Sequence, residues 1–144
     1  MISFDGKTNN LTGKKKSIKL IIRKIIDDHN KKLKNVEYIM MSDDELLEIN
    51  IQALKHNYYT DIITFDYSQD ELLEGEIYIS IDRVKDNAKE YFQEFHVELL
   101  RVIFHGILHM VGYKDKTPPE KKKMRQMEEY YLKEYQTIVP RGTI

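Results

Sequence analysis

The sequence predicts an α+β fold, in which a small mixed sheet of about four strands is covered by about five helices. Helical and strand-like segments follow one another in mixed order, two of the expected strands form a hairpin, and regular βαβ alternation is absent. The chain has 144 residues, and neither a repeat nor a linker-like segment divides it. We therefore expect a single domain over residues 1–144.

The first half of the chain is expected to form two helices with a strand between them. Residues 15–33 carry five isoleucines at helical spacing with charged residues on the other side, which indicates an amphipathic helix. Residues 36–41 form a short apolar run that predicts a buried strand. Ser42 can cap the helix that follows, and Glu45 completes a capping box, so we expect this helix to run to about residue 54.

The second half is expected to begin with a β-hairpin and to end in three helices. One segment is rich in β-branched and aromatic residues, the next alternates apolar and polar residues, and a loop over residues 68–75 would join them. Asp82 is a candidate cap for the next helix, and Pro118-Pro119 suit the first turn of the last one. We expect strands over residues 61–67 and 76–82, and helices over residues 83–94, 96–112 and 119–136.

Composition and charge exclude several classes of protein. The chain has no cysteine, which excludes a disulfide scaffold and a cysteine-ligated zinc finger and fits a reducing compartment. The formal net charge is −1, so no global field points to nucleic acid, and lysine clusters at residues 14–16, 31–34 and 121–123 are interpreted as solvated helix surfaces. The N-terminus does not resemble a signal peptide, and no apolar stretch approaches the roughly 20 residues of a membrane span. We expect a cytoplasmic protein without a membrane partner.

The segment 105–115 carries the strongest chemical signal in the chain. His105 and His109 are four residues apart, so they share one face of a helix and both can reach a tetrahedral metal at about 2.0–2.1 Å. Gly112 can adopt a positive φ, end the helix and turn the chain back, which would bring Asp115 beside the histidines. Three protein ligands and an open fourth position are typical of catalytic zinc, which lowers the pKa of bound water to about 7.

Helical phasing places the histidines away from the apolar face of their helix. The apolar face comprises Val97, Leu100, Phe104, Ile107, Leu108 and Val111, and the opposite polar side comprises Glu98, Arg101, His105 and His109. A histidine pair that serves only surface hydrogen bonding is the alternative to a metal site. Gly106 stands where H-E-x-x-H proteases carry their general base, which disfavours a protease, and we expect it to leave room for a bulky substrate.

These motifs resemble those of the YbeY family, the bacterial rRNA maturation factors regarded as metal-dependent endoribonucleases. The segment from His105 to Tyr113 resembles the family signature H-G-x-L-H-x-x-G-Y-D-H, and Thr60 to Phe65 resembles its P-T-D-V-L-S-F strand. Glu74 to Ile77 resembles its L-G-D-I turn. The resemblance implies an α+β fold, a zinc ion, and a role in 16S rRNA 3′-end processing and ribosome quality control.

The chain departs from the family pattern at several positions. Asp115 stands in place of the family's third histidine ligand, and Lys114 in place of its aspartate. Carboxylate oxygen binds zinc at about 2.0–2.2 Å, so a site of two histidines and one aspartate remains sound and would widen metal choice towards Mn²⁺. Leu54 replaces the family's arginine, with Lys55 and His56 as its neighbours, which puts a phosphate contact there in doubt, and Tyr59 replaces a proline.

The leading hypothesis is a metal-dependent endoribonuclease that acts on single-stranded rRNA and the small ribosomal subunit. His105, His109 and Asp115 would hold one divalent ion, most simply Zn²⁺, which would activate water. Arg101 and Lys114 are the candidate catalytic cations near the phosphates, although a surface salt bridge with Glu98 explains Arg101 equally well.

Two alternatives remain, together with three residues that we do not place in the site. The protein would otherwise be a ribosome-assembly binding factor with a structural metal, or a metallohydrolase of another substrate class. We interpret Tyr113 as a packing residue rather than a base-stacking one, and His56 and His96 as surface or capping residues rather than ligands. A monomer is favoured over an oligomer.

Overall fold

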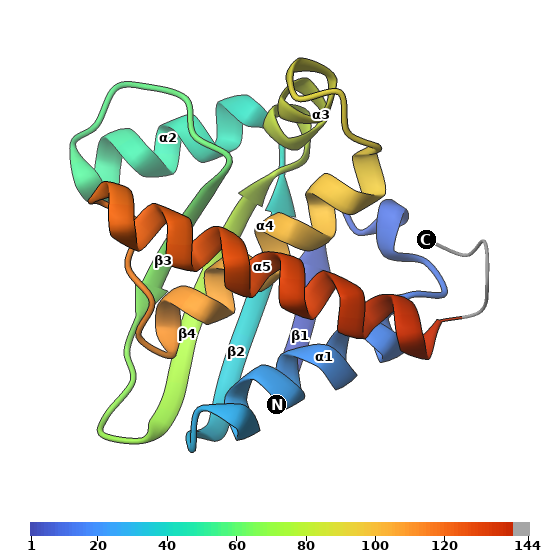
Figure 1. Cartoon of the computed structure of the whole chain (residues 1–144). Coiled ribbons are helices and arrows are strands. Elements are labelled where there is room, and N and C mark those ends of the chain that lie inside the picture. Colours follow the sequence, from blue (N-terminus) through green and yellow to red (C-terminus); the bar gives the residue numbers. More distant parts are fainter. Residues whose placement is uncertain (140–144) are drawn as a thin grey trace.

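The computed structural model describes residues 1–139 and confirms the predicted α+β class (Figure 1). Within these residues, one sheet of four strands has the order β1-β2-β4-β3. β1 pairs with β2 and β2 with β4 in parallel, whereas β3 and β4 form the antiparallel hairpin that the sequence predicts. The strands are β1 Ile2–Gly6, β2 Lys32–Met41, β3 Ile62–Asp66 and β4 Leu72–Ser80.

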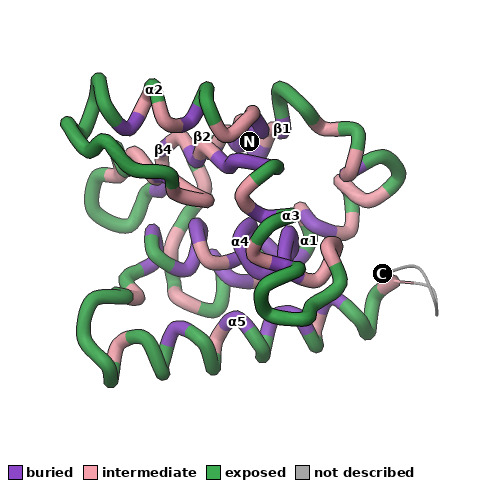
Figure 2. The backbone as a smooth tube through the Cα atoms, turned by 90° about the horizontal axis from the view of Figure 1, so that it is seen from above, coloured by how far each residue is buried: buried purple, intermediate pink, exposed green. Residues whose placement is uncertain are grey.

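Five α-helices cover the two faces of this sheet unequally. They are α1 Lys15–Asp28, α2 Asp43–Leu54, α3 Ile81–Glu90, α4 Phe95–Met110 and α5 Pro118–Ile138. Figure 2 shows α2 alone on one face, α1, α3 and α4 on the other, and α5 as an outer layer. Within residues 1–139, no helix combines the length and the apolar character that a bilayer span requires.

Alternation along the strands sends side chains to two hydrophobic clusters. In β2, Val36, Tyr38 and Met40 join the large cluster beneath α1 and α4, while Ile39 and Met41 face α2. The fully buried hydroxyl of Tyr38 donates to the carbonyl oxygen of Ile103 over 2.8 Å, which joins the sheet to α4. α4 is therefore held against the centre of the sheet.

Local sequence signals place several helix boundaries correctly. Ser42 caps α2, and its side chain and that of Glu45 form the expected capping box. Thr117 caps α5 with Glu120 in the same way, and Pro118 lies in the first turn. The cap of α3 is Ser80 rather than Asp82, so this helix begins two residues earlier than expected.

The sequence prediction was wrong where strands carry few apolar residues or lie at the end of the chain. β1 was not expected, because five residues show too little alternation to identify a strand that gains its stability by pairing with β2. α1 ends at Asp28 rather than residue 33, because Asn30 takes a left-handed φ of 57°. The polar residues that follow form the first half of β2, paired with the first half of β4, which was expected to be loop.

The predicted polar side of α4 is only partly open to solvent. Glu98 and Arg101 are only 5% and 6% exposed, because α5 covers the side of α4 that the sheet leaves open. His105 is half-buried and His109 is exposed. Glu98 and Arg101 are therefore enclosed between helices, whereas His109 lies on the surface.

Gly106 has a packing role instead of the expected role in making room for substrate. It is buried against the sheet, and a Cβ atom there would lie 3.0 Å from two atoms of Ile77 and 3.1 Å from Ile62. Glycine thus permits close contact between α4 and strands β3 and β4. This contact sets the depth at which the adjacent His105 lies.

Candidate active site

The turn after α4 carries out the chain reversal that the sequence predicts. Gly112 has a φ of 121°, and nothing lies within 4 Å of the position of a Cβ, so backbone conformation rather than space requires glycine here. The amide of Tyr113 donates to the carbonyl oxygen of Leu108 over 3.1 Å and closes the helix end. The next residues return along the helix and bring Asp115 to His105.

His105 lies between two carboxylates. Its Nδ1 is 2.7 Å from Oε2 of Glu128 on α5, and its Nε2 is 3.8 Å from Oδ2 of Asp115. Burial acts to lower the pKa of His105, but the hydrogen bond and the charge of Glu128 outweigh it and raise the pKa overall. When Glu128 accepts the Nδ1 proton of the neutral ring, the Nε2 lone pair is directed towards Asp115.

His109 is oriented by the backbone of the same turn. Its Nδ1 is 3.0 Å from the carbonyl oxygen of Tyr113, which leaves Nε2 as the atom able to bind a metal. Within residues 1–139, no three His, Asp or Glu side chains lie close enough together to hold a metal ion. The structure thus brings His105 and Asp115 together and leaves His109 one turn away. The donor atoms of all three residues are of the types that bind a divalent ion.

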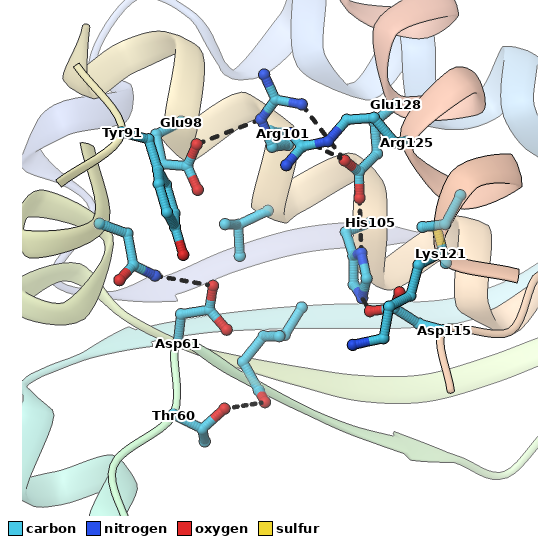
Figure 3. Close-up of a pocket in the computed structure, with 14 residues that line it drawn as sticks. Thr60, Asp61, Tyr91, Glu98, Arg101, His105, Asp115, Lys121, Arg125 and Glu128 are labelled. Atoms are coloured by element: carbon cyan, nitrogen blue, oxygen red, sulfur yellow. Dashed lines mark hydrogen bonds and ion pairs between the residues drawn. The ribbon is translucent and has the colours of Figure 1, made fainter. Parts of the chain in front are cut away.

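A cavity of about 520 Å³ opens beside His105 (Figure 3). Its walls come from the segment before β3, the end of α3, α4, the turn after α4, and α5. Most of the side chains that line it are polar or charged. They are Thr60, Asp61, Ile62, Asn87, Tyr91, Glu98, Arg101, Val102, His105, Asp115, Lys121, Met124, Arg125 and Glu128.

Arg101, a predicted catalytic cation, is surrounded by carboxylates. Its guanidinium lies 3.2 Å from Glu98, 3.4 Å from Glu128 and 2.8 Å from Glu129. The salt bridge with Glu98 therefore exists but is buried rather than on the surface. Through Glu128, Arg101 also supports the orientation of His105.

The second predicted catalytic cation, Lys114, is exposed and does not line the cavity. The cavity instead receives Lys121 and Arg125 from α5, and the side chain of Arg125 is 57% exposed. The three residues around the expected arginine position, Leu54, Lys55 and His56, do not line the cavity either. Lys121, Arg125 and Arg101 are the cations that the structure brings near His105.

Asp61 lies on the wall of the cavity opposite α5 (Figure 3). Burial raises the pKa of Asp61, and the charge of Glu128 acts in the same direction. His105 and a 3.4 Å hydrogen bond from Asn87 act against this rise but do not cancel it. A carboxylate with a raised pKa in a cavity is a frequent property of functional sites.

The ionised form of Asp61 should cost the protein stability. Because its folded-state pKa is raised, this cost is absent below the unfolded-state pKa and grows as the pH rises through the folded-state pKa. We expect Asp61→Asn to raise the melting temperature at pH 7–8, and the gain to shrink towards pH 4. Melting curves across this pH range test it, with Asp27→Asn on the exposed side of α1 as the control. A gain that does not depend on pH would contradict the explanation.

Four residues of the site, Lys121, Arg125, Glu128 and Asp61, could not be assigned to it from the sequence. Lys121, Arg125 and Glu128 follow one another at helical spacing, which places them on one face of α5, but no local signal shows that this face meets α4. Asp61 was assigned only to a strand. Long-range contact, rather than any motif, brings Glu128 and Asp61 to His105.

The remaining histidines and Tyr113 have partners outside the cavity. The Tyr113 hydroxyl lies 2.8 Å from Nε2 of His29, and its ring packs at the edge of the large core, in agreement with a packing role. His96 contacts Lys14 at 3.0 Å, and His56 contacts the hydroxyl of Tyr58 at 3.0 Å. None of these side chains lines the cavity.

Comparison with known proteins agrees with this geometry. A family model described as Endoribonuclease YbeY matches residues 2–136. The chain belongs to the endoribonuclease YbeY family. Membership of the YbeY family confirms the resemblance found in the motifs, and it confirms the predicted activity at the level of an endoribonuclease.

Individual relatives show how much of the chain the similarity covers. An Endoribonuclease YbeY from Parabacteroides distasonis is 43% identical over 115 residues, covering 80% of this chain and 81% of the relative. One from Christiangramia forsetii is 41% identical over 128 residues, covering 89% of this chain and 90% of the relative. The solution structure of a Thermotoga maritima protein matches with a TM-score of 0.68 and 31% identity, covering 94% of this chain and 88% of that one. The YbeY similarity thus includes both the sheet and the site.

Proposed function

We propose that this protein is a metal-dependent endoribonuclease that cleaves single-stranded rRNA, in 16S rRNA 3′-end processing and ribosome quality control. The observation that carries the proposal is the His105–Asp115 pair in the cavity wall, with the His105 ring oriented by Glu128. The partners would be rRNA and the small ribosomal subunit, and the location the cytoplasm. Membership of an endoribonuclease family supports the substrate class.

His105, His109 and Asp115 would hold one divalent ion, Zn²⁺ in the first instance and Mn²⁺ as the alternative. The side chains of the cavity support a cation there, because four carboxylates line it together with the imidazole of His105. Ligation by all three residues requires the side chains of His109 and Asp115 to approach each other. When bound, the ion would supply a Lewis acid and an acidic water molecule.

The other residues of the cavity would bind and orient the RNA strand. Lys121 and Arg125 lie on the solvent side of the cavity, where they are able to neutralise a phosphate. Arg101 is held by three glutamates, so its contribution would be to keep Glu128, and through it His105, in place. Glu128 would fix the tautomer of His105 that offers Nε2 to the ion.

Cleavage of a single-stranded rRNA fragment by the purified protein tests this proposal. We expect a chelator to abolish cleavage, Zn²⁺ or Mn²⁺ to restore it, and His109→Ala to lower its rate by at least about a hundredfold, because one ligand is lost. His56→Ala serves as the matched control, since His56 is exposed and lies outside the cavity. Cleavage that survives both chelation and His109→Ala would rule out the metal mechanism.

The same experiment separates two other functions. Intact RNA, together with a protein that unfolds when its metal is removed, would favour a ribosome-assembly factor with a structural metal. Turnover of peptides or small molecules, but not of RNA, would favour a metallohydrolase of another class. The ion pairs of Arg101 with three glutamates give some support to the assembly factor, because they leave one cation fewer to contact the substrate.

A further inference from the structure

Two aromatic residues directly follow helix α3, and the first of them lies at the cavity. Tyr91 lines the cavity, and the next residue, Phe92, is 97% exposed. Phe92 has a φ of 54°, and the amide of Gln93 donates to the carbonyl oxygen of Ala88 over 2.8 Å, so Phe92 occupies the left-handed position that closes a helix. Glycine and asparagine are the usual residues at this position.

Neither packing nor backbone geometry explains the phenylalanine. Its ring is almost fully exposed, and a left-handed φ is unfavourable for a bulky side chain. The other non-glycine residues with positive φ in residues 1–139 are the polar Asn30, Lys55 and Asp70. A backbone conformation that is costly for phenylalanine, combined with complete exposure of its ring, indicates that the ring serves contact with another molecule.

The position of the pair relates it to the chemistry of the cavity. In Figure 3, Tyr91 lies on one side of the cavity, while Lys121 and Arg125 lie on the other, with His105 on their side. The aromatic residues come from the end of α3 and the basic ones from α5. A ligand that occupies the cavity can therefore meet an aromatic surface and cationic groups at the same time.

A single strand of RNA presents this combination of groups. Its unpaired bases offer flat faces that stack on aromatic side chains, and its phosphates pair with lysine and arginine. In a duplex the base faces are occupied by their neighbours, so an aromatic pair at a rim discriminates in favour of unpaired strands. A protein partner would fit less well, because the surface next to Tyr91 is a polar cavity bordered by cations rather than an apolar groove.

We propose that Tyr91 and Phe92 form a stacking platform for an unpaired nucleobase of the RNA strand that enters the cavity, while Lys121 and Arg125 hold a phosphate of that strand. This inference rests on the endoribonuclease function proposed above and adds to it a means of selecting single-stranded substrate. The exposed position of Phe92 places the first stacking contact outside the cavity, before the strand reaches His105.

The absence of tryptophan from the chain permits a direct test. Phe92→Trp introduces the only tryptophan of the chain and keeps an aromatic ring at the platform. On rapid mixing with a single-stranded RNA oligonucleotide, before cleavage products accumulate, we expect saturable quenching of its emission, as stacking on a base requires. A duplex of the same sequence and a base-free sugar–phosphate oligomer should leave the emission unchanged. Tyr67→Trp is the matched control and should show no quenching. Tyr67 is exposed and follows β3, near the start of β4, whereas α3 and the platform follow the end of β4.

Phe92→Asn provides a second measurement that does not depend on a fluorophore. Asparagine suits the left-handed position, so the fold should persist, while affinity for single-stranded RNA should fall about tenfold through loss of one stacking contact. Unchanged affinity, or equal quenching by duplex and single strand, would overturn the platform.

The outcomes also separate the platform from the proposed function. If the wild-type protein cleaves RNA but Phe92→Asn binds as tightly, only the platform fails. If the wild-type protein neither binds nor cleaves RNA, both fail. RNA that leaves the emission of the Phe92→Trp variant unchanged, while the wild type still cleaves, would point to a protein partner for these two rings.

Discussion

Arg101→Ala is expected to lower the free energy of unfolding by about 3–5 kcal/mol, because it leaves buried carboxylates without their counter-ion. The side chains of Arg101, Glu98 and Glu128 are only 8%, 6% and 7% exposed, so solvent screens their charges weakly. Urea denaturation monitored by circular dichroism measures the effect. Glu128 would also lose the ion pair with Arg101 that helps to hold it beside His105. We therefore expect activity to fall together with stability.

The pH dependence of this effect provides an internal check. Burial raises the pKa of Glu98, and Arg101 opposes that rise, so removal of Arg101 moves the pKa of Glu98 further up. The cost of the substitution should therefore be largest at high pH and shrink as the pH falls through the pKa of Glu98, where the carboxyl becomes neutral.

Arg83 offers the matched control for Arg101. It pairs with Asp43 at 2.6 Å, but their side chains are 30% and 21% exposed, so Arg83→Ala should cost no more than about 1 kcal/mol. Equal losses for the two substitutions would show that the burial of the Arg101 network has no energetic consequence.

Glu128→Gln is expected to weaken the binding of Zn²⁺ or Mn²⁺ by about ten- to a hundredfold, because it removes the charged acceptor that orients His105. Glu128 lies 2.7 Å from Nδ1 of His105, and its substitution by the near-isosteric glutamine keeps the shape of the side chain. Calorimetric titration of the metal-free protein with each ion measures the affinity directly, independently of any RNA cleavage.

The neighbouring residue isolates the contact with His105. Glu129 also pairs with Arg101, at 2.8 Å, but its side chain is 49% exposed. Among residues 1–139, the carboxylate that is hydrogen-bonded to His105 is that of Glu128, not that of Glu129. Glu129→Gln should therefore leave metal affinity nearly unchanged. If both variants lose affinity equally, the effect comes from the general loss of negative charge rather than from the orientation of His105.

Together these features describe a site that is costly to the folded protein. Burial raises the pKa values of Asp61 and Glu98, and both line the same cavity as His105. Raised pKa values among clustered carboxylates are more frequent in functional sites than in structural cores. A bound divalent ion would reduce their mutual repulsion, so removal of metal should affect stability as well as activity.

Features that depend on neighbouring residues could be predicted from the amino-acid sequence. The capping box of Ser42 and Glu45, the helix across both histidines, and the reversal at Gly112 follow from local backbone preferences. The motifs around His105 also identified the family, because residues of one short segment carry the signature. Each of these depends on interactions over a few positions, which spacing encodes directly.

Contacts between distant parts of the chain could not be predicted from local patterns. β1 is a strand because it pairs with β2, and the polar start of β2 is a strand because it pairs with β4. Gly106 faces the sheet rather than the cavity, and Arg101 is buried because α5 covers α4. Glu128 reaches His105 from a position 23 residues away. Such contacts depend on how helices and strands pack, and packing is a property of the whole chain that local patterns do not contain.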